Sequence, residues 1–574
     1  MQDTGERSGA LFLIGLGLVN AICFTLLLST IGFIFNLPLS FWHFPLALVC
    51  ALAVNFFAAR WLLPEDRKAF IKNGIFVLAI VITSILIAGL FYDLSFDGQW
   101  YHQEMIYQLK QGWNPFRAEL PDQVTAAIWL NHYPRGAEIP EAAIYCLTGR
   151  IEYGKSINFI LFIASFFLAL AFLLKIKWFK TWKAVSIAFL FAFHPVVIGQ
   201  LSSFCLDGQM ASILVCLLAA FAFLYYDLNR YYLLLLVSSI VITINLKFTG
   251  LPFSIIFVAA FILLVALQRR RLEFKRIAVA CLVGFLLAGL FVGFNPYVTN
   301  TVKEHYTFYP LNTKLGKETF DLLSPGSFKH RNRLGKLMVS LFTHTNDYSG
   351  DVEPRPKIPF TLNKVDIVNA ANPQIRMAGF GPFFSGAIVL SMIALGAIIF
   401  LAGHKSSLLR IGILLAFLAL SVIIVDTAWC LKYVPQLWFL PLIIAVAAEW
   451  VTKRWMSWLR NAIYISLALN IGWAFLSIPY GLLKSAQIDY QLAQLKATKD
   501  PVTLDYEHFN SNRIRFYEND IPVREEDLQN RISGYLIHST TRYYSPDTLP
   551  ILPKPNLLRW NDALKRKLKM QTSF

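Results

Sequence analysis

The sequence predicts an all-α polytopic membrane protein of about thirteen transmembrane helices, followed by a small mixed α/β domain. Three observations support this prediction. Of 574 residues, 56% are hydrophobic and only 15% are charged, too few polar side chains to cover a soluble protein of this size. The charged residues are clustered, and long uncharged stretches separate the clusters. Basic residues recur in every second connection between these stretches.

The uncharged stretches have the length of membrane spans. Residues 73–92 and 461–483, for example, contain 20 and 23 residues without a charge, and a helix needs about 20 apolar residues to cross a bilayer. Strands of a barrel would alternate apolar and polar residues, so helices are expected. The predicted spans are 10–36, 41–63, 73–92, 156–174, 184–202, 208–226, 231–246, 248–268, 277–297, 378–403, 410–431, 433–450 and 461–483.

The distribution of basic residues predicts the orientation. Lys and Arg gather in alternating short loops, as in 175–183 and 269–276, and are sparse in the loops between. This positive-inside pattern places the amino terminus in the cytoplasm. It also accounts for the net charge of +17 without a nucleic-acid partner. An odd number of spans then places the carboxyl terminus outside, and a bacterial inner membrane is the expected location.

Three long segments share the predicted outer side: the loops 93–155 and 298–377 and the tail 484–574. The first loop is expected to contain two short helices, near 100–109 and 138–151. The second is rich in Pro, Asn and Lys and is expected to be an irregular lid or binding loop.

The chain is therefore divided into a transmembrane domain, 1–483, and an outer domain, 484–574. In the outer domain, residues 502–504 and 513–517 are predicted to be strands and 525–532 a helix.

The segment Tyr92–Glu104 follows the third predicted span and contains the main catalytic candidates, Asp97 and Asp93. Carboxylates at the membrane boundary are partly desolvated, which favours general-base chemistry. Tyr101, His102 and Glu104 of the same segment are candidates for binding a polar substrate. The alternative is that Asp93 or Asp97 caps the short helix that follows.

The triplet Asp-Gly-Gln of residues 97–99 recurs at 207–209, next to another predicted outer loop. Two such turns on one face would line one cleft, and Asp207 is therefore a candidate for substrate binding. A chance repeat of three residues is the alternative.

The long first outer loop with its acidic residue, the many spans and the terminal outer domain resemble the GT-C glycosyltransferases, membrane enzymes that use polyprenyl-phosphate sugars. The resemblance implies that Asp97, or less directly Asp93, is the general base. This base would deprotonate an acceptor hydroxyl, which attacks the anomeric carbon with inversion. The chain has neither the adjacent Asp-Glu of protein mannosyltransferases nor a WWDYG-like run, so no subfamily is implied.

The leaving phosphate needs positive charge at the membrane boundary. The candidates are Lys247, Arg376 and Lys432, with Tyr433 beside the last. Each has an ordinary alternative, because basic side chains at helix ends snorkel to lipid headgroups and aromatic ones form interfacial belts.

The expected partners are a polyprenyl-phosphate-linked sugar, a glycan, lipid or protein acceptor, and membrane lipids. No cofactor is expected, and a divalent metal ion is left open without support from any motif. Two alternatives remain: a transporter or flippase of a lipid-linked saccharide, and a glycan polymerase or ligase.

Overall fold

A computed structural model of the chain describes residues 2–63, 68–268, 271–311, 313–314, 316–318, 324–346, 353–401, 405–498, 500–528, 533–545, 549–550 and 552–567. The described chain is mostly helical, with one small sheet near its carboxyl end. The long helices form a bundle. They are α1 (Gln2–Ile34), α2 (His43–Leu62), α3 (Ala69–Ala88), α7 (Ser156–Ile176), α8 (Thr181–Ala192), α10 (Asp207–Tyr226), α11 (Arg230–Leu246), α12 (Gly250–Leu267), α13 (Arg271–Leu286), α18 (Phe384–Leu401), α19 (Lys405–Ile423), α20 (Phe439–Ala447), α21 (Arg454–Ala474) and α22 (Ser477–Lys496).

Ten helices within the described residues are long and apolar enough to cross a membrane, with α21 and α22 counted as one run. They correspond to ten of the predicted spans, so an integral membrane protein is supported. The other three predicted spans fall on the shorter apolar helices α8, α11 and Pro435–Trp450. The total of thirteen and the orientation of the termini stay predictions.

The predicted span 184–202 is not one continuous helix. Helix α8 ends at Ala192, and a separate short helix, α9 (Pro195–Gln200), follows. Pro195 has no N–H to continue the first helix, and the His194 Nδ1 atom accepts a hydrogen bond from the Val196 N–H at 3.0 Å. The segment therefore turns within the protein, where its polar backbone groups are satisfied.

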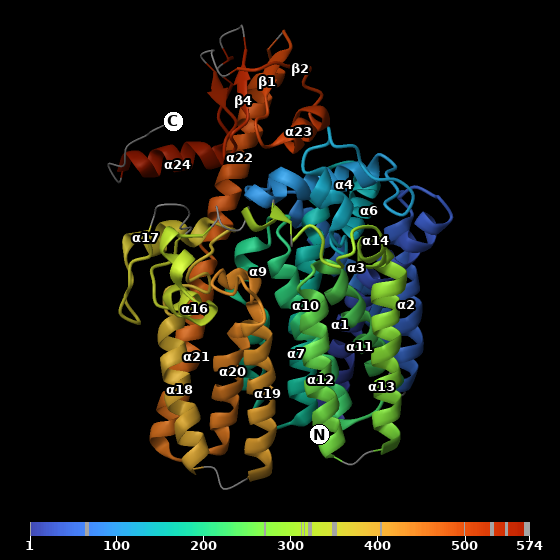
Figure 1. Cartoon of the computed structure of the whole chain (residues 1–574), viewed down its shortest axis with the longest axis vertical. Helices are drawn as coiled ribbons and strands as arrows, with labels where there is room; N and C mark the ends of the chain where they lie inside the picture. The colour runs from blue at the N-terminus through green and yellow to red at the C-terminus, as the bar shows by residue number, and fades with distance from the viewer. Residues whose placement is uncertain are drawn as a thin grey trace.

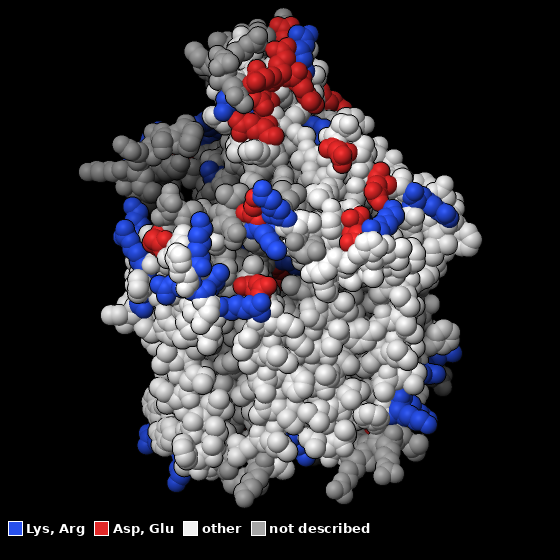
Figure 2. Space-filling view, in the orientation of Figure 1, with Lys and Arg blue, Asp and Glu red and all other residues white. Residues whose placement is uncertain are grey.

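The two ends of the bundle differ in shape and charge. Most of the short helices and the terminal domain gather at one end, and the amino terminus lies toward the other (Figure 1). In Figure 2, a broad uncharged surface covers the long helices and separates charged groups at the two ends. A band of this kind is what a membrane-spanning region presents to lipid. We call the end with the terminal domain the upper end.

Short helices form most of the upper end. They are η1 (Gly98–His102), α4 (Gln103–Lys110), α5 (Ala127–His132), α6 (Glu138–Thr148), η2 (Ile151–Lys155), α9, η4 (Phe294–Val298), α14 (Thr299–Lys303), η5 (Gly326–His330), α16 (Arg333–Leu341), α17 (Lys364–Val368), η6 (Asn369–Ala371), η7 (Leu431–Tyr433) and η8 (Pro435–Trp438). The two helices predicted in the first outer loop are confirmed by η1 with α4 and by α6. The second outer loop contains short helices as well as irregular chain.

The terminal domain contains a four-stranded sheet of order β2-β1-β4-β3. Strand β1 is parallel to β2 and antiparallel to β4, which is antiparallel to β3. Helix α22 links the bundle to this sheet (Figure 1) and runs through the predicted domain boundary at 483. The domain's elements are β1 (Val502–Asp505), η10 (Asn510–Asn512), α23 (Arg513–Glu518), β2 (Val523–Glu525), β3 (Gly534–Tyr535), β4 (Arg542–Tyr544) and α24 (Asn556–Lys567).

The strand predicted at 502–504 is confirmed, but two other predictions for this domain are wrong. Residues 513–517 lie in helix α23 and not in a strand. The prediction failed because an alternation of five residues is too short to distinguish a strand from a turn of helix. The predicted helix 525–532 begins in strand β2 at Glu525, and its last four residues lie outside the described residues.

Glu518 of α23 fastens the terminal domain to the bundle by accepting a hydrogen bond from the Ile151 N–H at 2.8 Å. Burial raises the pKa of this carboxyl from 4.5 to about 7. The folded protein therefore favours the protonated form, and this contribution to stability is lost as the pH rises from 4.5 through about 7.

We expect the Glu518→Gln variant, which keeps an acceptor without the charge, to lack this pH dependence. Its free energy of unfolding should exceed that of the wild type by about 3 kcal/mol above pH 7 and match it near pH 4. Thermal unfolding of both detergent-solubilised proteins across this range measures the difference, in which all other titrating groups cancel. A difference that does not vary with pH would contradict the assignment.

Candidate active site at the upper end of the bundle

Asp97 lies just before η1 and does not cap it. It occupies the N-cap position, but its side chain makes no capping hydrogen bond. The carboxylate is 29% exposed, and one of its oxygens lies 3.6 Å from the Lys432 amino nitrogen. The capping alternative therefore fails for Asp97, whose carboxylate faces a basic side chain instead of the helix backbone.

Lys432 lies in η7, which follows α19, and brings a buried positive charge to Asp97. Its side chain is only 3% exposed. Burial disfavours the charged form, but Tyr433 and Asp97 hold the pKa of Lys432 well above its ordinary value. Lys432 is therefore a cation at every physiological pH and does not snorkel to headgroups.

The surroundings of Asp97 keep it ionised. Burial alone would raise its pKa, but nearby positive charges outweigh this effect and hold the pKa below its ordinary value of 3.8. Four basic side chains contribute: Lys432, His102, Lys247 and Arg376. All four were selected from the sequence, and the structure brings them together from separate elements.

The second Asp-Gly-Gln turn lies beside the first. Asp207 is the first residue of α10, and its Oδ1 atom lies 2.7 Å from the Nζ atom of Lys247, which follows α11. The ring of Tyr433 lies between the two pairs, with its centroid 4.0 Å from the Lys247 nitrogen and 5.3 Å from the Lys432 nitrogen. We call Asp97, Lys432, Asp207, Lys247 and Tyr433 the paired-charge cluster.

Asp93 has a structural role instead. It is fully buried and its two oxygens accept hydrogen bonds from the Ser95 N–H at 2.8 Å and the Phe204 N–H at 3.3 Å. Both oxygens thus bind backbone groups, and the side chain fixes the loop before η1 against the chain that precedes α10. Neither bond is to an amide of η1, so Asp93 holds the loop without capping that helix.

Gly98 is required by its contact with Asp93. A Cβ atom at this position would lie 1.6 Å from Asp93 Oδ2 and 2.5 Å from Ser95 Oγ. The backbone of Gly98 is not left-handed, so no special conformation requires glycine here. The need is therefore steric.

We expect Gly98→Ala to lower the free energy of unfolding by about 1–3 kcal/mol or more, because the Asp93 side chain must move and break its backbone hydrogen bonds. Gly199→Ala is the matched control, since a Cβ there meets nothing within 4 Å. Thermal unfolding of the purified proteins measures both. Equal midpoints for the two variants would show that the Gly98 contact is unimportant.

Tyr101 and His102 also lie beside Asp97. Burial and the Asp97 charge raise the pKa of Tyr101. His102 is buried, and its Nδ1 atom lies 2.7 Å from Glu138 Oε1. The sequence analysis missed Glu138, although two carboxylates three residues apart in the apolar helix α6, at 138 and 141, were a visible signal.

Tyr133 was missed as well. Burial and the charge of Asp97 raise its pKa, which places the phenol among the neighbours of the candidate base. Nothing in its sequence context distinguishes it from the other tyrosines of the chain.

Glu104, the remaining candidate of this segment, contacts the terminal domain. It is 1% exposed, and its oxygens lie 2.7 Å from both terminal nitrogens of Arg513 in the terminal domain. The prediction that Glu104 binds substrate stays a prediction, and the contact with Arg513 gives the carboxylate a structural role. The carboxylate is already used in a two-pronged ion pair that holds the domains together.

The terminal domain also holds the loop that carries Asp97. The buried guanidinium of Arg515 donates to the Asp93 carbonyl at 2.6 Å. The Gln99 side chain donates to the His538 carbonyl at 3.1 Å, and the ring of Phe96 contacts that of Phe509 with centroids 5.0 Å apart. The terminal domain thus contacts residues before and after Asp97 and fixes the position of the loop that carries it.

A cavity of about 20 Å³ adjoins Lys432, between α9, α21 and the chain around Asn372. This volume admits about one water molecule. Among the residues that the structure describes, no group of three His, Cys, Asp or Glu side chains is placed to hold a metal ion.

The arrangement can bind an anion and hold a base next to it. Two lysines, Lys432 and Lys247, pair with the carboxylates of Asp97 and Asp207, and Arg376 is a further positive charge near Asp97. No protein-family model matches the chain, and no curated protein or solved structure matches it.

Proposed function

We propose that the chain is a membrane glycosyltransferase of the GT-C type that transfers a sugar from a polyprenyl-phosphate carrier to an acceptor hydroxyl. The observation that carries the proposal is an ionised, partly exposed carboxylate, Asp97, held beside permanent cations at the upper end of a membrane bundle. A base and a phosphate site next to each other are what this reaction needs.

Asp97 accepts the proton of the acceptor hydroxyl as its oxygen attacks the anomeric carbon. The bond between that carbon and the phosphate oxygen breaks, and the phosphate leaves with the bonding electrons. Lys432, Lys247 and Arg376 stabilise the charge that develops on the leaving oxygen.

Donor binding would also make Asp97 a better base. In the structure, the Lys432 amino nitrogen lies 3.6 Å from an oxygen of Asp97, and Lys432 also lines the small cavity described above. A phosphate that attracts Lys432 weakens its hold on Asp97, so the pKa of Asp97 rises toward a value better matched to proton transfer. The cation thus couples donor binding to activation of the base.

The reaction is assigned to the non-cytoplasmic face of a bacterial inner membrane, with the amino terminus in the cytoplasm. The three outer segments at the upper end and the positive-inside pattern of the loops support this orientation. The acceptor is a glycan, lipid or protein hydroxyl.

The test uses the purified full chain in proteoliposomes with a set of radiolabelled polyprenyl-phosphate sugars and a membrane extract as the acceptor source. We expect label to move from at least one donor into a product that no longer extracts with the carrier lipid. Label that remains on the carrier and crosses the bilayer would instead identify a lipid-linked saccharide transporter. The absence of both would overturn the proposal.

A further inference from the structure

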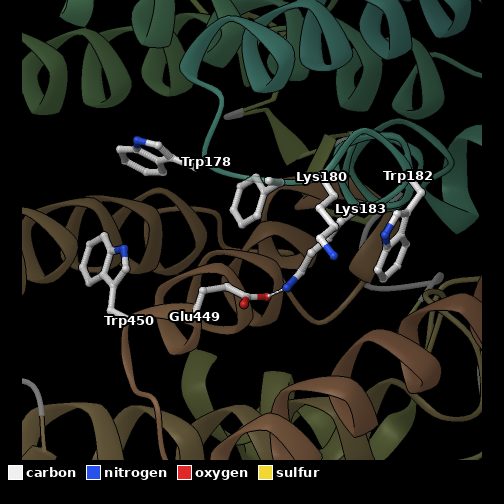
Figure 3. A pocket seen from close by; sticks show the side chains of 7 residues that line it. Trp178, Lys180, Trp182, Lys183, Glu449 and Trp450 are labelled. Carbon is white, nitrogen blue, oxygen red and sulfur yellow. Dashed lines mark ion pairs between the residues drawn. The ribbon is translucent and has the colours of Figure 1, made fainter.

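A second hollow lies at the lower end of the bundle, opposite the paired-charge cluster, and has a volume of about 610 Å³. It is formed where the turn between α7 and α8 meets the turn between η9 (Ala448–Trp450) and α21. Three indole side chains surround it, those of Trp178, Trp182 and Trp450, and Lys180, Lys183 and Glu449 lie among them (Figure 3). Its size is that of a site for a small ligand.

The hollow has an excess of positive charge. Glu449 is bound by two cations, with its oxygens 2.5 Å from Lys183 Nζ and 2.7 Å from Arg460 NH1. One carboxylate between two cations leaves a net charge of one. Lys180 is exposed and adds another, since no ion pair involves it among the described residues. The hollow therefore attracts an anion.

The three indoles place the hollow at the level of lipid headgroups. Trp178, Trp182 and Trp450 are 55%, 67% and 42% exposed, although burying a tryptophan is strongly favourable. They lie next to the ends of membrane spans, where exposed indoles pack against the glycerol region of the bilayer. A belt of single tryptophans would explain exposure alone, but here three converge on one basic hollow.

We propose that this hollow binds the headgroup of an anionic phospholipid from the adjacent leaflet. Lys180 and Lys183 bind the phosphate, and the indoles pack against the glycerol and the first acyl carbons. The exposed indoles favour a lipid over a soluble phosphate, which would leave them in contact with water. This site is independent of the proposed glycosyl transfer.

The test compares lipid retention by the full-length protein, purified in detergent with equimolar phosphatidylglycerol and phosphatidylcholine, using native mass spectrometry. We expect the wild type to retain phosphatidylglycerol preferentially. Lys180→Gln should reduce this preference about fivefold, in line with the contribution of one basic group at an anionic membrane surface. The double change Lys180→Gln with Trp182→Leu should abolish it.

Lys177→Gln is the matched control, because Lys177 is exposed in the same turn but does not line the hollow. It should leave the preference unchanged. Equal losses in Lys177→Gln and Lys180→Gln would reduce the effect to general surface charge and overturn the proposal. So would displacement of the retained phosphatidylglycerol by millimolar inorganic phosphate, which would identify a soluble anion as the ligand.

Discussion

Replacing Asp97 by asparagine should lower the rate of sugar transfer by about 100- to 10,000-fold, the usual contribution of a general base. The substitution preserves the size of the side chain and removes its ability to accept the proton. Because Asp97 makes no capping hydrogen bond, the substitution removes no such bond from the start of η1. The measurement is single-turnover transfer from a labelled donor by equal amounts of folded protein.

The donor affinity of this variant distinguishes a base from a binding residue. Asp97 competes with the donor phosphate for Lys432, so its neutralisation should leave donor affinity unchanged or increase it. A base therefore predicts a fall in kcat without a rise in the dissociation constant of the donor. A variant that transfers at the wild-type rate, or loses only donor affinity, would refute the assignment of Asp97.

Asp93→Asn is an informative comparison for the same assay. Asp93 holds two backbone N–H groups, and the amide that replaces it must turn one N–H group toward a donor. We therefore expect a lower yield of folded protein and a lower free energy of unfolding for this variant. The transfer rate per folded molecule should change less than either.

Much of the candidate site could be predicted from the sequence because it consists of charges at the ends of apolar stretches. Asp207, Lys247 and Lys432 lie at the ends of predicted spans on the side where basic residues are sparse. Because successive spans alternate in direction, the sequence also predicts which of these charged residues share one side of the membrane. The pairing was not predictable, because it depends on how α10, α11 and η7 pack.

The remaining features depend on contacts between distant parts of the chain. The sequence pattern 513–517 alternates like a strand, but Arg515 lies in a helix and reaches the Asp93 carbonyl, 422 residues away. The sequence context of Glu104 suggests a substrate ligand, but in the structure its carboxylate forms an ion pair with Arg513. Some polar residues near the first outer loop thus attach the terminal domain, and local sequence does not separate these from the proposed catalytic residues.

The second large effect is expected from Lys432→Met, which removes the cation nearest to Asp97 while keeping an apolar side chain of similar length. Loss of one group that stabilises the leaving phosphate should lower kcat by about 100- to 1,000-fold. A change in the pH profile should accompany it. Lys432 contributes most among the positive charges that hold the pKa of Asp97 below 3.8, so its removal should raise that pKa.

The sign of this shift makes the prediction specific. Asp97 acts as a base only when ionised, so kcat/KM falls as the pH drops through its pKa. In the wild type this acid limb should lie below pH 3.8, and in Lys432→Met it should move to higher pH. Lys432→Arg keeps the charge and should keep the acid limb in place, even if the rate falls. If the limb stays where it is in Lys432→Met, Lys432 does not control Asp97, and the coupling between donor binding and the base is wrong.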